Sequence, residues 1–117
     1  PESIATARSF VDKIYIDDRI ADYIVDIVQA SREPHTVSEE LAEFVEFGAS
    51  PRATLALTLC AKANAFLDGR GYVIPQDVKD LAHDVLRHRI ATTYEAEAEE
   101  KTSDDVIDAI LNFVPVP

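Results

Sequence analysis

The sequence predicts an all-α fold, a bundle of four main helices plus a short N-terminal helix, with one small pair of extended segments. The chain has only three glycines and no tryptophan, and 47% of its residues are hydrophobic, enough for a real core. Several segments place apolar residues at the i, i+3, i+4 spacing of an amphipathic helix. At 117 residues the chain has the length of one domain, which buries about two thirds of its unfolded surface. We therefore treat residues 1–117 as a single helical domain.

The first half of the chain carries two of the expected helices. Residues 2–12 read as a short helix, and residues 13–16 read as an extended connector. Asp17 or Asp18 then caps a second helix that runs to about Ser31, before a loop over residues 32–38. The buried side of this second helix follows the helical spacing and consists of Ile20, Tyr23, Ile24, Ile27 and Val28.

The middle of the chain is expected to hold the central helix of the bundle. Residues 38–47 are predicted to form one or two helical turns that lead into Gly48. The next helix begins at Pro51 and ends at Gly69, which suits the left-handed position after a helix. Its few polar residues lie on one narrow line: Thr54, Thr58 and Lys62. A helix this apolar is predicted to have partners on most of its sides.

The last third is expected to contain two more helices. Residues 72–73 are extended, and Pro75 opens a helix that residues 87–89 close with three basic or histidine side chains. Residues 92–101 are polar and acidic and are expected to be the most mobile part. Thr102 or Ser103 starts the final helix. Its expected buried side is Val106, Ile107, Ile110, Leu111 and Val114.

Composition excludes several classes of function. Eleven basic residues against twenty-two acidic residues give a net charge of −11, which disfavours nucleic acid and anionic membranes as partners. No apolar stretch is long enough for a transmembrane helix. The single cysteine, Cys60, is expected to be a small core residue, and a reducing, cytoplasmic setting is expected. Because the first residue is Pro1, we expect a piece of a longer chain.

The candidate site is the start of the central helix. Ser50 is a suitable cap, Pro51 takes the first helical position, and Arg52 follows. A cation at a helix N-terminus is unfavourable, because that end already carries partial positive charge. Free N–H groups beside a guanidinium outline a phosphate site. The alternative is an exposed arginine paired with a local carboxylate.

Other constellations are weaker or absent. No lysine follows a glycine in the phosphate-binding pattern Gly-x-x-x-x-Gly-Lys-Ser/Thr. His83 and His88 are five residues apart and cannot share a metal ion well, and no metal site is expected. Arg87 and Arg89 either cap the end of their helix or reach a phosphate or a neighbouring subunit.

Several segments, in order, resemble one known family. These are Tyr23–Arg32, the run Gly48-Ala49-Ser50-Pro51-Arg52-Ala53, Tyr72–Val78, Val85–Ile90 and Asp105–Pro117. Together they are similar to the C-terminal lid of the MoxR-type AAA+ ATPases, over a stretch from about residue 13 to the end.

The resemblance implies a function for the site. Arg52 would be the sensor-2 arginine that contacts the γ-phosphate of ATP, with Ser50 and Pro51 beside it, while Tyr23 faces the adenine or packs in the core. The missing α/β domain would hold ATP and Mg²⁺, so this chain alone is not expected to be catalytic. The family forms rings, typically hexamers, and remodels partner proteins in a chaperone-like way; the client protein is unknown.

Two alternatives stay open at this stage. One is a free-standing helical module that binds a partner helix in an apolar groove. The other is the lid of a magnesium-chelatase-like AAA+ protein.

Overall fold

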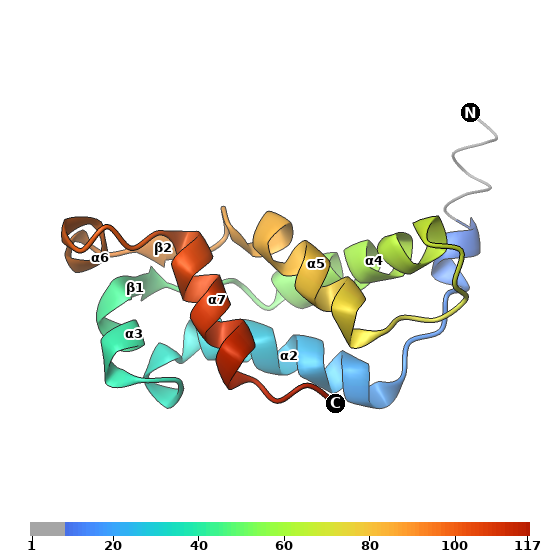
Figure 1. The fold of residues 1–117 in the computed structure, drawn as a ribbon, viewed down its shortest axis with the longest axis horizontal. Coiled ribbons are helices and arrows are strands. Elements are labelled where there is room, and N and C mark those ends of the chain that lie inside the picture. The colour runs from blue at the N-terminus through green and yellow to red at the C-terminus, as the bar shows by residue number, and fades with distance from the viewer. Residues whose placement is uncertain (1–8) are drawn as a thin grey trace.

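A computed structural model describes residues 9–117 and confirms the helical bundle. The four main helices are α2 (Asp18–Arg32), α4 (Arg52–Leu67), α5 (Pro75–Leu86) and α7 (Ser103–Phe113), shown in Figure 1. Residues 9–12 form a helical turn; residues 2–8 of the expected first helix lie outside the described residues.

The helix ends follow the local signals in the sequence. Asp17 caps α2, since its carboxylate accepts a hydrogen bond from the Arg19 N–H at 2.8 Å. Thr102 caps α7: its hydroxyl accepts from the Asp105 N–H at 3.3 Å, and the Asp105 carboxylate accepts from the Thr102 N–H at 2.9 Å. Gly69 ends α4 with a φ of +75°, as expected for a glycine after a helix.

Residues 45–47 differ from the prediction. The helical segment α3 (Glu39–Phe44), capped by Ser38, stops at Phe44, and the chain continues as strand β1 (Val45–Phe47). This strand pairs antiparallel with β2 (Ala91–Thr92), so that Val45 lies opposite Thr92. The strand partner is distant in sequence, and local periodicity therefore carried no signal for it.

The two predicted extended segments lie side by side. Tyr15 and Tyr72 form a single parallel bridge, in which the Tyr15 N–H donates to the Gly71 carbonyl and the Val73 N–H donates to the Tyr15 carbonyl, both at 2.9 Å. This bridge fastens the connector before α2 to the turn before α5.

Two short helices were not predicted. The 3₁₀ helix η1 (Pro34–Thr36) lies within the loop after α2. The segment expected to be the most mobile contains α6 (Tyr94–Ala98), which Thr93 caps through its hydroxyl. Ala96 of α6 is fully buried, and α6 packs against α3 at one end of the molecule (Figure 1).

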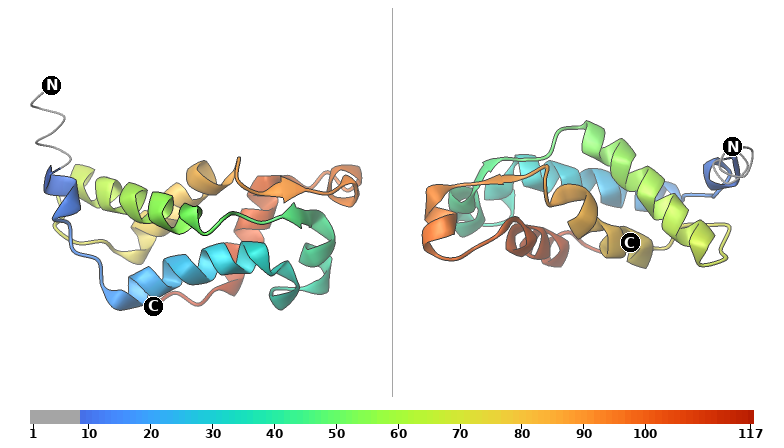
Figure 2. Two further views of the ribbon diagram at one scale, coloured as in Figure 1. Left: turned by 180° about the vertical axis from the view of Figure 1, so that it is seen from behind. Right: turned by 90° about the horizontal axis from the view of Figure 1, so that it is seen from above.

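The core lies between the four main helices. Helix α4 packs on α5 and α2, and α7 packs across both α2 and α5 (Figure 2). All five residues expected on the buried side of α2 are buried, and so are four of the five expected on α7, Leu111 being partly buried. Helix α5 contributes Val78, Ala82 and Leu86.

Candidate functional site

The predicted site lies where the segment Gly48–Pro51 enters α4. Arg52 is the first residue of the helix, and Pro51 already has helical dihedrals, with φ −56° and ψ −23°. The Ala53 N–H donates to the Ser50 carbonyl at 2.9 Å, and the Thr54 N–H donates to the Pro51 carbonyl at 3.1 Å. Within residues 9–117 the Arg52 N–H makes no hydrogen bond, so it remains available to an incoming group.

Ser50 does not cap the helix, which corrects the prediction from sequence. Pro51 takes the cap position, and no side chain makes a capping hydrogen bond there. The reason is local: the backbone carbonyls of Ser50 and Pro51 already accept the N–H groups of Ala53 and Thr54. The side chain of Ser50 is left exposed beside Arg52.

Arg52 has no acidic partner in the part of the chain that the structure describes. Its side chain is exposed, and none of the ion pairs formed there includes it. The alternative of an arginine neutralised by a local carboxylate is therefore wrong for the described residues. Acidic residues outnumber basic residues two to one in this chain, so carboxylate partners are plentiful. An arginine that lacks a carboxylate partner at a helix N-terminus therefore favours binding of an external anion.

The segment before Arg52 is bound to the end of α2. The Ser31 hydroxyl donates to the Val28 carbonyl at 2.6 Å and accepts from the Ala49 N–H at 3.0 Å. Arg32 Nη1 donates to the Ala49 carbonyl at 3.3 Å. At Gly48 a Cβ atom would lie 2.1 Å from the Ser31 carbonyl oxygen, which only glycine tolerates.

The contact between Ser31 and the segment before Arg52 was not predicted from the sequence. A signal was present, because Ser31 lies four residues after Ile27 and so on the buried side of α2. Its exposed fraction is 0%. A small polar residue on the buried side of a helix needs a hydrogen-bond partner, and Ala49 supplies it.

Tyr23 lies in the core and not on the surface. Its exposed fraction is 2%, and its hydroxyl is buried without a hydrogen-bond partner among the described residues. Burial raises the pKa of this phenol above its ordinary value. Contact with an adenine would require Tyr23 to leave the core, so the structure favours the second of the two roles predicted for it.

Helix α4 has one buried side and one exposed apolar side. The buried side consists of Ala53, Leu57, Ala61 and Ala65. The opposite side exposes Leu55 at 64% and Leu59 at 43%. The prediction of partners on most sides is thus wrong within residues 9–117. Within the described residues, Leu55 and Leu59 are left uncovered.

The remaining candidate residues have structural contacts. Arg87 Nε donates to Asp104 at 2.9 Å, and His83 Nε2 lies 2.7 Å from Asp108, so both connect α5 to α7. Arg89 donates to the Val85 carbonyl at 3.1 Å. Cys60 was expected in the core, but it is only half-buried on α4.

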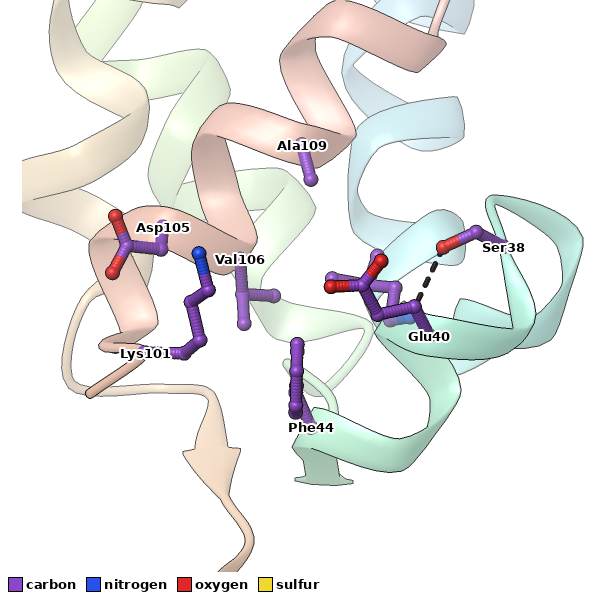
Figure 3. A pocket seen from close by; sticks show the side chains of 8 residues that line it. Ser38, Glu40, Phe44, Lys101, Asp105, Val106 and Ala109 are labelled. Atoms are coloured by element: carbon purple, nitrogen blue, oxygen red, sulfur yellow. Dashed lines mark hydrogen bonds between the residues drawn. The ribbon is translucent and has the colours of Figure 1, made fainter. Parts of the chain in front are cut away.

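A separate small cleft of about 170 Å³ opens between α3 and α7 (Figure 3). Phe44 and Val106 form its apolar floor, and Glu40, Lys101 and Asp105 form a charged rim. None of its lining residues belongs to the Gly48–Arg52 segment.

No group of three or more His, Cys, Asp or Glu side chains within residues 9–117 is placed to hold a metal ion. No helix in that range is long and apolar enough to cross a bilayer.

Comparison with known proteins identifies the class of domain. Residues 38–110 match the family model described as the AAA lid domain, and this match includes all of α4 and most of α7. A crystal structure of a "putative ATPase" from Cytophaga hutchinsonii superimposes with a TM-score of 0.88 at 39% identity. The superposition covers 93% of this chain and 33% of the chain in that crystal structure.

The relatives by sequence specify the type. Chaperone MoxR1 of Mycobacterium tuberculosis is 41% identical over 104 residues, which is 88% of this chain and 28% of the relative. Protein MoxR of Paracoccus denitrificans is 35% identical over 102 residues, covering 81% of this chain and 30% of the relative. The chain belongs to the AAA lid domain family and is of the MoxR type. It spans about a third of the length of the relatives it matches.

Proposed function

We propose that this lid closes over ATP held by the α/β domain of a MoxR-type ATPase and presents Arg52 to the γ-phosphate. The observation that carries the proposal is the exposed guanidinium of Arg52, without a carboxylate partner in residues 9–117, at the start of α4. The Arg52 N–H, at the positive end of the helix, adds a second donor for the same anion. Ser50 and Pro51 border the phosphate on the exposed side.

The chemistry that Arg52 supplies is electrostatic. A guanidinium can donate two parallel hydrogen bonds to phosphoryl oxygens and offset the charge that develops on them during transfer. Because the charge of the γ-phosphate disappears from the site after hydrolysis and release, the lid is held closed in one state and freed in the other. We assign Mg²⁺ to the α/β domain.

The exposed side of α4 supports a docking surface for that α/β domain. Leu55 and Leu59 follow Arg52 along the helix at spacings of three and seven residues, so they lie on the same side as the guanidinium. Apolar side chains this exposed gain stability when another surface covers them. Closure of the lid would bury these leucines and bring Arg52 to the nucleotide in one movement.

Ring assembly and chaperone-like remodelling of a client protein complete the proposal, by similarity to the family. The same exposed leucines are what a free-standing helix-binding module would need. Arg52, which has no carboxylate partner within residues 9–117, lies at the edge of that surface. It favours the nucleotide-linked role, because an apolar helix in a groove offers no anion for a guanidinium to bind.

The test is Arg52→Ala in the complete ATPase. ATP turnover should fall by about one to three orders of magnitude, because one preorganised charge is removed from a phosphoryl-transfer site. Arg52→Lys should recover only part of the rate, since lysine lacks the planar fork. Thermal melting of the chain should change little, because a cation is unfavourable at this position. Unchanged turnover in Arg52→Ala would contradict the assignment.

A further inference from the structure

We propose that Ser31 and Gly48 are positioning residues for Arg52, so that the end of α2 determines where the guanidinium is held. This inference rests on the proposed function of Arg52. The group of Ser31, Gly48 and Ala49 is called the α2–α4 junction below.

The junction fixes both backbone polar groups of Ala49. The buried Ser31 hydroxyl accepts the Ala49 N–H at 3.0 Å, and Arg32 Nη1 donates to the Ala49 carbonyl at 3.3 Å. Ala49 itself is fully buried. The Ser31 hydroxyl is in turn oriented by its own donation to the Val28 carbonyl at 2.6 Å. The hydroxyl therefore has one orientation, and Ala49 has one place.

Gly48 brings the two segments into direct backbone contact. A Cβ atom there would lie 2.1 Å from the Ser31 carbonyl oxygen and 2.6 Å from the Arg32 Cα. Both neighbours are backbone atoms of α2, which cannot move aside as a flexible side chain could. Any larger residue at position 48 would push the segment away from α2.

The segment from Ala49 to Arg52 transmits this position with little freedom. Pro51 has a fixed φ, and the carbonyls of Ser50 and Pro51 already accept the N–H groups of Ala53 and Thr54. The segment thus forms the first turn of α4 as soon as it leaves the junction. A displacement of Ala49 is passed to Arg52, and a displacement of about 1 Å in a reacting site can cost about a hundredfold in rate.

The experiment is a double-mutant cycle in the complete ATPase. Ser31→Ala should lower ATP turnover per folded molecule by about tenfold, by loosening Arg52. In the Arg52→Ala background, Ser31→Ala should cause no further loss, because the residue it positions is gone. Ser38→Ala is the control: it removes the exposed serine hydroxyl that caps α3 and accepts the Leu41 N–H at 3.0 Å, without touching the junction. It should leave turnover per folded molecule unchanged.

A milder variant covers the case in which Ser31→Ala does not fold. Ser31→Cys keeps a similar volume but offers a weaker acceptor to Ala49, and an intermediate loss of turnover is expected. The positioning role would be overturned if the Ser31 variants lowered ATP turnover equally in the wild-type and Arg52→Ala backgrounds. It would also be overturned if they lowered turnover in neither background. Arg52→Ala by itself tests the proposed function, so a failure there is seen separately from a failure of the cycle.

Discussion

Arg70 binds Asp77 with both terminal nitrogens of its guanidinium, Nη1 to Oδ2 at 2.7 Å and Nη2 to Oδ1 at 2.6 Å. Asp77 also accepts the Ile74 N–H at 2.8 Å and Asn64 Nδ2 at 2.9 Å, and its exposed fraction is 1%. The carboxylate thus joins the end of α4, the connecting turn and the start of α5.

Asp77→Ala should destabilise the domain. The substitution removes four hydrogen bonds and leaves the Arg70 guanidinium without its main partner. We expect the free energy of unfolding to fall by about 2 kcal/mol, less than for a fully buried pair because Arg70 is partly exposed. Urea denaturation of the chain measures it. Asp80→Ala, an exposed neighbour on α5, is the control and should change the stability by less than about 0.5 kcal/mol.

Asp77 should also make stability depend on acid pH. Burial would raise the pKa of its carboxyl, but hydrogen bonds from Arg70, the Ile74 N–H and Asn64 outweigh burial and hold the pKa below its ordinary value. A carboxyl with a lowered pKa in the folded state contributes stability above its unfolded pKa, and this is lost as the pH falls through the folded pKa. The free energy of unfolding should therefore drop below about pH 4. In Asp77→Asn the free energy of unfolding should fall less steeply with decreasing pH than in the wild type. Identical slopes would contradict this role of Asp77. Asp22→Asn, at an exposed position, is the control.

Gly48 and Gly71 should respond oppositely to alanine. At Gly48 a methyl group meets backbone at 2.1 Å, so we expect a loss of about 2–3 kcal/mol or failure to fold. At Gly71 a Cβ meets nothing within 4 Å and its φ is not positive, so alanine should be neutral or stabilise by a few tenths of a kcal/mol. Melting curves of the two variants decide the matter, and equal melting temperatures would show that the close approach of Gly48 to α2 is wrong.

Glu100→Gly should stabilise the chain. Glu100 has a φ of +58° after α6, a left-handed conformation that favours glycine. The Lys101 N–H donates to the Ala96 carbonyl at 2.8 Å, and the Glu100 N–H donates to the Glu97 carbonyl at 3.0 Å, the two bonds of a Schellman turn. Glycine should add about 0.5–1 kcal/mol to the free energy of unfolding. Glu99→Gly, one residue earlier and without positive φ, should instead lower it.

The sequence by itself determined the features that depend on residues close to one another along the chain. The buried side of α2 follows from spacings of three and four residues, and its start follows from Asp17. The place of Arg52 at the beginning of a helix follows from Pro51, whose ring presets the backbone. Such features are encoded within one or two helical turns, and the amino-acid order therefore shows them.

The tertiary structure alone decided what depends on segments far apart in the chain. Val45 is a strand residue because Thr92 lies opposite it, and Ala49 is held in place because Ser31 reaches it from another helix. The same holds for α4, which is apolar on nearly every side. Which of its leucines would be left exposed was set by where α2 and α5 pack, since an all-apolar helix carries no periodic signal for its own orientation.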